Sequence, residues 1–536
     1  MKMNESTCAR RAFVHHTTLL VLIGAVVGVY GLAQLGNYKF VLGRAIAQAQ
    51  VQSSAQTAYV KSSNTGSGDA FGRSVAISGN TMVIGAELES SAAKGVDGDQ
   101  SDNSAQSSGA AYVFERDSNG KWTQQAYLKA SNTDTGDVFG RAVAIDGNTI
   151  VIGAPLESSA ATGINSDQTD NTARGSGAVY VFVRNGTIWT QQAYIKSSNS
   201  EMLDNFGEAV AVAGDTVAVG ALGEDGGTRG INGDVTDNSR LGSGAVYIFR
   251  RNDTVWSQEA YIKASNADVI DEFGGSLSIS GDAIVVGASS EDSAATGTNG
   301  DAGNNNAADS GAAYVFTRSN IGKWSQTAYL KASNTESMDR FAISVSINGD
   351  TIVVGANGEG SSATGVNGDQ SNNNALRSGA AYIFARNNNQ WVPQAYLKAS
   401  NTDAEDLFGS RVGVSGDLVT IGASAEDGSS PGIDGSSNNA ASSAGAAYLF
   451  VRTGGQWNQL RYLKASNPDV NDGFGSAVFV DGRTIAVAAT GEDSAATGID
   501  GDQSNNGAIF SGAMYLFDAG DTTIYRVFVP VTRVNA

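Results

Sequence analysis

The stretch DVFGRAVAIDGNTIVIGAP, residues 137–155, recurs along the chain with small variations. Its phenylalanine belongs to a set of seven, spaced 66 to 68 residues apart. The seven are Phe71, Phe139, Phe206, Phe273, Phe341, Phe408 and Phe474. Six of them are followed by Gly, and the fifth is followed by Ala342. The six Trp of the chain and the Tyr of seven segments resembling AYLKASN keep the same spacing. A repeat this regular indicates seven equivalent structural units.

Each repeat contains four short runs suited to β-strands. In the second copy these runs are FGRAVAI, TIVIGA, GAVYVF and WTQQAYIKSS, separated by turn residues. They are too short for ordinary helices and are rich in Val, Ile, Tyr and Phe, which favour a pleated sheet. The turn between the first two runs, residues 146–148, has Gly in the middle in all seven copies. Gly supplies the positive φ of a tight hairpin, so each repeat is predicted to form a four-stranded sheet.

The second run of each repeat is apolar on both faces, as residues 150–152 show, so each sheet needs cover on both sides. Small residues at 153–154 and 177–178 would let neighbouring sheets approach closely. A ring of seven sheets covers every face with an identical neighbour. An open solenoid is the alternative, and it would need polar caps, whereas the first and last copies here resemble the middle ones. We therefore predict an all-β fold, a seven-bladed β-propeller of four-stranded antiparallel blades.

Two segments are candidates for closing this ring. TAYVKSS, residues 57–63, resembles the fourth run of a repeat and could complete the last sheet beside GAMYLF, residues 512–517. TIYRVFVPV, residues 523–531, stands where the last fourth run is expected but lacks its Trp. We place the propeller within residues 57–531 and a short tail at 532–536. The repeats are expected to start near residues 58, 126, 193, 260, 328, 395 and 461.

The Phe139-Gly140 pair and the Gly153-Ala154-Pro155 triplet resemble the FG-GAP repeat, the unit of the integrin α-subunit propeller and of many bacterial surface proteins. The resemblance extends over residues 57 to about 517, although the GAP triplet is complete only in the second repeat. It implies a seven-bladed propeller that recognises other macromolecules, without naming a ligand. Integrin-like propellers hold calcium in an acidic loop early in the blade. Here that connection is the tight hairpin, so the familiar calcium loop is missing from its familiar place.

The connection between the second and third runs is long in every repeat, as in residues 87–109 and 155–176. Loops of this length are uncommon inside compact domains and are often functional. The seven loops together carry 25 of the 54 acidic residues of the chain. We expect them to lie on one rim of the ring and to form its contact surface.

Oxygen-bearing side chains alternate within these loops. Ca²⁺ takes about six to eight oxygens, and oxygens at alternate positions begin many calcium loops. The candidate calcium ligands are Asp97, Asp99, Ser101 and Asp102; Asn165, Asp167, Thr169 and Asp170; Asn232, Asp234, Thr236 and Asp237; Asn367, Asp369 and Ser371; and Asp500, Asp502 and Ser504. Glu157, or the Glu-Asp pairs at 224/225, 291/292, 426/427 and 492/493, could complete the shell. The alternative is that these residues form solvated Asx-turns without a metal, since the bidentate Glu at a fixed offset is missing.

A second regular set consists of an Asp two residues before each Phe, such as Asp137, and a Lys eight residues before each Asp, such as Lys129. A role shared equally by seven repeats is usually geometric. We interpret the set as structural turns or salt bridges, and an exposed pair of this kind would contribute about 1 kcal/mol or less.

The composition excludes several classes of function. His15, His16 and Cys8 all precede an apolar stretch that begins near residue 17, so a chain without this leader has neither residue type. Ser-His-Asp and Cys-His catalysis, zinc sites and disulfides are thereby excluded. The net charge of −20 argues against nucleic acid as a partner. A carboxylate pair of the glycosidase kind remains, but no repeat carries an irregularity that marks one.

Residues 1–50 differ in composition from the rest. Basic residues precede segment 17–38, which has no charged side chain, so we expect a signal peptide or an N-terminal membrane anchor. Either would place the propeller outside the cytoplasm, secreted or at the cell surface. The sequence thus predicts an exported, monomeric, non-enzymatic binding or adhesion module for an extracellular protein or glycan, touching a membrane only through an uncleaved leader. A structural matrix protein without a specific ligand is the alternative, and a carboxylate-dependent glycan-cleaving enzyme is the third class.

Overall fold

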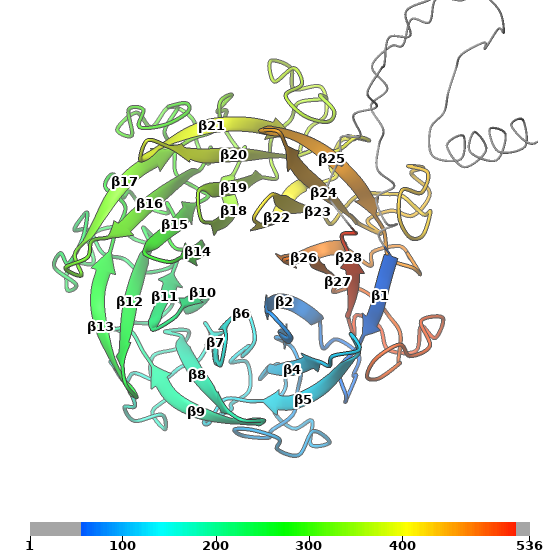
Figure 1. The fold of residues 1–536 in the computed structure, drawn as a ribbon. Helices are drawn as coiled ribbons and strands as arrows, with labels where there is room; N and C mark the ends of the chain where they lie inside the picture. Colours follow the sequence, from blue (N-terminus) through cyan, green and yellow to red (C-terminus); the bar gives the residue numbers. More distant parts are fainter. Residues whose placement is uncertain (1–54, 521–536) are drawn as a thin grey trace, which may run out of the picture. The chain divides into compact units, whose positions relative to one another are not determined.

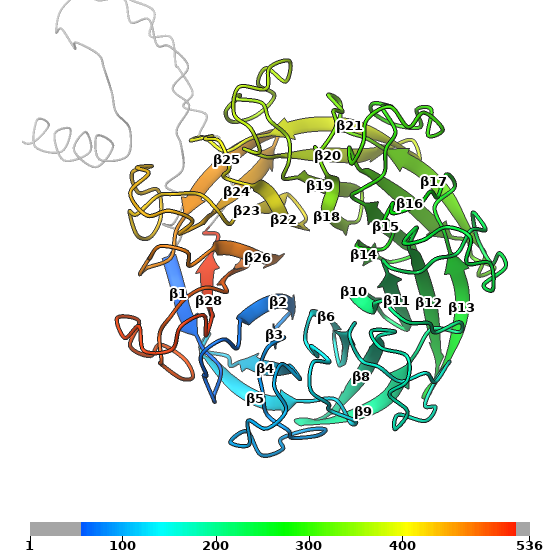
Figure 2. The same cartoon turned by 180° about the vertical axis from the view of Figure 1, so that it is seen from behind.

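The computed structural model describes residues 55–520, and within this range it contains strands and no helix. The strands form seven separate four-stranded sheets arranged in a ring (Figure 1), and residues of the first strands line a central channel. Neighbouring strands pair antiparallel, and the first strand of each sheet lies nearest the channel (Figure 2). The predicted all-β, seven-bladed β-propeller is therefore confirmed.

We number the blades one to seven along the chain and give the strands of each from the channel outward. Blade one has β2 (Phe71–Ser78), β3 (Thr81–Ala86), β4 (Ala110–Arg116) and β5 (Trp122–Leu128); blade two has β6 (Ala142–Asp146), β7 (Thr149–Ala154), β8 (Ala178–Asn185) and β9 (Ile188–Ile195). Blade three has β10 (Phe206–Ala213), β11 (Thr216–Ala221), β12 (Ala245–Asn252) and β13 (Val255–Ile262); blade four has β14 (Ser276–Ser280), β15 (Ala283–Ala288), β16 (Ala312–Arg318) and β17 (Trp324–Leu330). Blade five has β18 (Phe341–Asn348), β19 (Thr351–Ala356), β20 (Ala380–Asn387) and β21 (Gln390–Leu397); blade six has β22 (Phe408–Ser415), β23 (Leu418–Ala423), β24 (Ala446–Thr453) and β25 (Gln456–Leu463). Blade seven has β26 (Phe474–Asp481), β27 (Thr484–Ala489), β28 (Ala513–Asp518) and β1 (Ala55–Val60).

The strand directions give the ring two different faces. The tight turns from first to second strand and from third to fourth strand lie on one side, which we call the hairpin face. The first of these turns has Gly at positive φ, as predicted; in blade two this is Gly147, with φ of 55°. The long loops from second to third strand and the links into the next blade lie on the other side, the loop face. All candidate calcium ligands therefore lie on the loop face.

Strand β1 closes the ring by pairing with β28 as the outermost strand of blade seven (Figure 1). The chain thus joins the first and last blades through hydrogen bonds between segments far apart in sequence. Of the two closing segments considered above, residues 57–60 belong to β1. The competing segment, 523–531, lies outside the described residues, as do the leader at 1–50 and the tail at 532–536.

Small residues set the spacing between blades, as the sequence predicted. A Cβ on Gly153 would lie 1.9 Å from the carbonyl oxygen of Gly207 in the next blade. Gly177 has a φ of 81°, and a Cβ there would lie 2.1 Å from the carbonyl oxygen of Phe206. The backbone N–H of Phe206 donates to the carbonyl of Ser176 at 3.1 Å. Neighbouring sheets are therefore joined by backbone contacts that a larger side chain would prevent.

Aromatic side chains fill the space between these sheets. Phe139 packs edge-on against Tyr180 with ring centroids 5.3 Å apart, and Tyr180 packs against Tyr194 at 5.4 Å. All six residues of β7 are buried, because its two faces contact the sheets on either side. Every blade repeats this arrangement, which places the apolar core in seven layers between the blades.

No helix of the described range is long and apolar enough to cross a membrane.

Candidate functional site

The loop-face loops are tied to the outermost strands by the first residue of the predicted calcium pattern. The backbone N–H of Asp97 donates to the carbonyl of Tyr127 at 2.8 Å, and the Oδ1 atom of Asp97 accepts the N–H of Tyr127 at 2.9 Å. Asp97 has a φ of 53°, which this two-way contact imposes. The same contact is made by Asn165, Asn232, Asn299, Asn367, Asp434 and Asp500. The first position of the pattern is therefore an anchor of the loop.

The next acid of the pattern closes a local turn. The Oδ1 atom of Asp99 accepts the backbone N–H of Ser101 at 2.9 Å and its hydroxyl at 2.7 Å. These hydrogen bonds hold the pKa of Asp99 below its usual range. The equivalent pairs are Asp167 with Thr169, Asp234 with Thr236, Asp369 with Ser371 and Asp502 with Ser504. Asp102, Asp170 and Asp237 likewise accept the N–H of the residue two positions on. These contacts are the Asx-turns of the metal-free interpretation.

The hydrogen bonds that these oxygens accept are relevant to the predicted calcium site. One oxygen of each anchoring residue and one of each turn-closing acid already accept a hydrogen bond within the loop. Within residues 55–520, no three acidic, His or Cys side chains gather closely enough to hold a metal ion. The loops as arranged here do not form a calcium shell from carboxylates, and the calcium site stays a prediction.

The five glutamates considered as distal calcium ligands are anions of buried ion pairs, and Glu89 and Glu359 form the same pair in the other two blades. In blade two, Glu157 accepts the Lys196 ammonium at 2.9 Å on Oε2 and the Tyr194 hydroxyl at 2.9 Å on Oε1. Lys196 also donates to the Ser176 hydroxyl at 2.7 Å. Asn132, from the link that enters the blade, donates to Glu157 at 2.8 Å. Burial lowers the pKa of Lys196, and the carboxylate opposes that shift.

The ion pair of this network recurs in every blade with nearly constant geometry. In blade one the Tyr127 hydroxyl makes no hydrogen bond to the glutamate, and in blade six Ala444 replaces the serine, so Lys464 donates to the carbonyl of Gly445. The ion pairs are Glu89 with Lys129, Glu157 with Lys196, Glu224 with Lys263, Glu291 with Lys331, Glu359 with Lys398, Glu426 with Lys464 and Glu492 with Lys61. Both members of each pair are at most 2% exposed. A buried charge is tolerated when it is paired and hydrogen-bonded, so the network is structural.

The Asp set before each Phe forms turns, as predicted, but the lysines do not pair with it. The Oδ2 atom of Asp137 accepts the backbone N–H of Asp134 at 2.9 Å, and burial raises the pKa of Asp137 to about 7. Lys129 is paired with Glu89 instead. The physical reason is position in the ring: Lys129 directly follows the fourth strand of its own blade, beside the loop that holds Glu89, whereas Asp137 lies in the link to the next blade.

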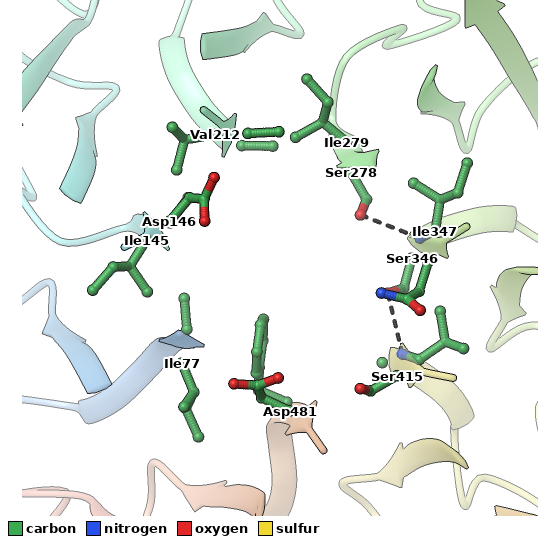
Figure 3. A pocket seen from close by; sticks show the side chains of 18 of the residues that line it. Ile77, Ile145, Asp146, Val212, Ser278, Ile279, Ser346, Ile347, Ser415 and Asp481 are labelled. Atoms are coloured by element: carbon green, nitrogen blue, oxygen red, sulfur yellow. Dashed lines mark hydrogen bonds between the residues drawn. The ribbon is translucent and has the colours of Figure 1, made fainter. Parts of the chain in front are cut away.

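The hairpin-face half of the channel is a cavity of about 420 Å³ lined by the first strands of the blades. In Figure 3, the Ser278 hydroxyl accepts the N–H of Ile347 in the next blade, at 3.2 Å. Asp146 accepts the N–H of Gly214 at 2.6 Å, and Asp481 accepts the N–H of Gly79 at 2.8 Å. The last of these contacts joins blades seven and one. These polar side chains therefore fasten neighbouring blades together.

The loop-face half of the channel differs because its charged residues occur in only a few blades. It is a cavity of about 360 Å³ whose lining includes Arg73, Arg141 and Glu208. In blade one, the two residues that follow Phe71 form a β-bulge, because they have no pairing partner on β3. Arg73 belongs to this bulge and lies at the channel mouth. Arg141 pairs with Glu208 at 2.8 Å and with Glu87 at 3.0 Å, and Arg73 pairs with Glu87 at 2.8 Å.

Exposed apolar side chains also gather on the loop face. Of the sixteen exposed large hydrophobic side chains in the described range, twelve lie in loop-face loops and links. They are Leu88, Leu156, Met202, Leu203, Leu241, Val269, Ile270, Met338, Leu376, Val470, Ile509 and Phe510. The N–H of Ile270 donates to the carbonyl of Leu241 at 2.8 Å, so the long loop of blade three and the link that follows the blade lie side by side. The sequence pattern missed this grouping because the residues come from different loops and links.

The described geometry agrees with the comparison to protein families. The model of the FG-GAP repeat matches residues 55–114, 122–182, 189–249, 256–316, 324–384 and 391–450, which together make up more than half of the chain. The chain belongs to the FG-GAP repeat family. Each matched unit begins with the outermost strand of one blade and continues into the next, so the FG-GAP unit is offset from the blade by one strand. This offset is what leaves β1 available to complete blade seven. No curated protein matches this FG-GAP chain.

Proposed function

We propose that this FG-GAP protein is an exported, non-enzymatic binding or adhesion module whose loop face contacts an extracellular protein or glycan. The observation that carries the proposal is the uneven distribution of exposed apolar side chains, twelve of sixteen of which lie on the loop face. Such side chains cost free energy when left in water, and their concentration on one face is typical of an interaction surface. The rigid blades beneath would present this surface with little change in shape.

A binding role is also supported by where the acidic side chains are used. Each of the seven buried glutamates is paired with a lysine and accepts an asparagine N–H, and six of them also accept a tyrosine hydroxyl. The exposed acids Asp99 and Asp102 accept hydrogen bonds of their own turns. A glycosidase needs two carboxyl groups placed on either side of one sugar linkage. The repeated acids have the same structural task in every blade. Export rests on the charge and hydropathy of residues 1–50, which lie outside the described range.

The test compares two pairs of exposed apolar residues with similar exposure. Leu241 and Ile270 lie on the loop face, and Ile188 and Val255 lie beside hairpin-face turns. The protein and both double Ser variants are applied to immobilised glycans and extracellular proteins, and retention is measured alongside reducing-sugar release. We expect retention without release, weakened at least tenfold by Leu241→Ser with Ile270→Ser and unchanged by Ile188→Ser with Val255→Ser. Equal losses in both variants, or no retention at all, would refute the loop face as a binding surface, and sugar release would indicate an enzyme.

We retain calcium as a proposed ligand of the loops, tested separately from binding. A metal that binds the folded protein raises its melting temperature by mass action. The expected result is a higher melting temperature in millimolar Ca²⁺ than in excess chelator, reduced by Asp99→Asn with Asp102→Asn. An unchanged melting temperature would show that the loops are stable as plain Asx-turns.

A further inference from the structure

Arg411 occupies a position of the repeat that is small in every other blade. It is the fourth residue of β22, counted from Phe408, and its equivalents are Ser74, Ala142, Ala209, Ser276, Ser344 and Ala477. Its side chain lines the loop-face half of the channel, in the cavity of about 360 Å³ that Arg73 and Arg141 also line. One blade thus adds a third guanidinium to a channel mouth that already holds two.

Arg411 lacks the carboxylate partner that the other two arginines have. Arg73 and Arg141 are paired with Glu87 and Glu208. The Nη1 atom of Arg411 donates to the backbone carbonyl of Ser410 at 2.8 Å. Within residues 55–520, no carboxylate oxygen lies within 4.0 Å of its guanidinium nitrogens.

The surroundings of Arg411 disfavour its charge. Burial in the channel lowers the pKa of Arg411 to about 10, and repulsion by Arg73 and Arg141 adds to this shift. Glu208 and Glu87 act in the opposite direction without reaching the guanidinium. Glu272, the remaining acid on the lining, accepts the Ser290 hydroxyl at 3.2 Å. A partly buried cation without a counter-ion costs free energy, which a bound anion would recover.

We propose that the loop-face half of the channel is a binding site for a small oxyanion, with the Arg411 guanidinium as its main donor and Arg73 as a second cation. A guanidinium presents parallel N–H donors that match the two oxygens of a carboxylate or sulfate. Pockets for small organic ligands begin at roughly 300 Å³, so the cavity suits an anion up to about the size of a monosaccharide acid. The proposal is independent of whether the outer loop face binds a macromolecule.

The test is isothermal titration of the full chain with acetate, glucuronate and sulfate, with chloride at equal ionic strength and uncharged glucose as controls. Arg411→Ser is the decisive variant, because Ser occupies this position in three other blades and so fits the fold. Arg377→Gln is the matched control: Arg377 also lies on the loop face, but it is exposed and paired with Glu405 at 3.0 Å. Melting curves of both variants verify that they fold.

We expect at least one of the three oxyanions to bind the parent chain and glucose not to bind. Arg411→Ser should weaken that binding at least tenfold and leave the melting temperature in chloride unchanged or higher, whereas Arg377→Gln should leave binding unchanged. Preference for acetate and glucuronate over sulfate would define a carboxylate site, and the reverse order would define a site for tetrahedral anions. Absence of binding by all three anions would overturn the proposal, as would equal binding by the parent chain and Arg411→Ser.

Discussion

The ring contains two groups of charged residues, which differ in whether they are repeated in every blade and in how their charges are paired. The Glu-Lys pairs beneath the loop face occur in all seven blades, and each charge has its partner in the same blade. The charges at the loop-face mouth of the channel come from single blades, and Arg411 there has no carboxylate partner in the described range. In a ring of equal units, what is repeated holds the units together. Of the unrepeated charges, Arg73, Arg141, Glu87 and Glu208 pair with one another, whereas Arg411 is the one that we propose for recognition.

The repeated network joins blades as well as strands. In the link between blades one and two, Asn132 donates to Glu157 at 2.8 Å and accepts the Tyr180 hydroxyl at 2.5 Å. Glu157 in turn accepts Lys196 and Tyr194 from the outermost strand of blade two. Each carboxylate thereby connects the second and fourth strands of its own blade with the link that enters it.

The largest loss of stability is expected when one of the repeated Glu-Lys pairs is broken. Glu157→Gln leaves the buried Lys196 ammonium without its counter-charge, which costs about 3 kcal/mol or more in the free energy of unfolding. Adding Lys196→Met removes the uncompensated charge and should restore part of the loss. Urea unfolding followed by circular dichroism measures both variants.

The matched control for this experiment is an exposed pair. Glu405→Gln removes the partner of Arg377, whose side chain is 53% exposed, and should cost less than about 1 kcal/mol. A loss in Glu157→Gln no larger than that of Glu405→Gln would show that the buried pairs are dispensable, and the contrast between the two groups of charges would then be lost.

The buried Asp that precedes each Phe is expected to have an intermediate effect on stability, and this effect depends on pH. The pKa of Asp137 is raised to about 7 by burial, above its unfolded value, so the folded state retains the proton longer. Its contribution to stability is complete at acid pH and is lost as the pH rises towards 7. Six equivalent residues act in the same direction: Asp69, Asp204, Asp271, Asp339, Asp406 and Asp472. The urea midpoint should therefore fall between about pH 4 and pH 7.

A single substitution tests whether these Asp carboxyls cause the pH dependence of stability. Asp204→Asn keeps an oxygen that can accept the N–H of Glu201 but carries no titrating proton. This variant should unfold at a higher urea concentration than the parent chain at pH 8 and show a shallower fall with pH. A parent midpoint that rises from pH 4 to pH 7 would contradict the assignment.

The sequence predicted the ring well because its signals are local and repeated. The Gly of each hairpin, the small residues at 153–154 and the recurring Phe139 position each have a direct steric consequence within one blade or at its border. The four-stranded blades and their number followed from these residues alone. The choice of β1 as the closing strand could not be made in this way, because two segments had the right pattern and only pairing with β28 distinguishes them.

The partners of the repeated charges are harder to predict from the sequence. Lys129 was grouped with Asp137 because the two lie eight residues apart, and its actual partner, Glu89, lies 40 residues away. A usable signal was present, since a Glu follows the second strand in all seven repeats at a constant distance. Arg411 is visible in the sequence as the one large side chain at its position of the repeat. Its neighbours Arg73 and Arg141 come from other blades, so only the closed ring shows that the three line one cavity.

The smallest loss of stability is expected when a repeated Arg-Trp contact on the outer surface is removed. The Arg452 guanidinium lies 5.1 Å from the centre of the Trp457 ring and 2.7 Å from Asp417. Four other blades have an equivalent Arg-Trp contact. Solvent weakens such contacts, so Arg452→Gln should lower stability by about 0.5 to 1 kcal/mol. A loss as large as that of Glu157→Gln would mean that repetition alone, without burial, determines the contribution to stability.

The most direct test of the contrast is one titration series on three proteins: the parent chain, Glu157→Gln and Arg411→Ser, each titrated with the same oxyanions at a temperature where all are folded. We predict that Glu157→Gln, although less stable, binds the anion as the parent chain does, and that Arg411→Ser, although at least as stable, does not. Equal anion binding by Arg411→Ser and the parent chain, or loss of binding in Glu157→Gln alone, would contradict the division between repeated structural charges and an unrepeated binding site.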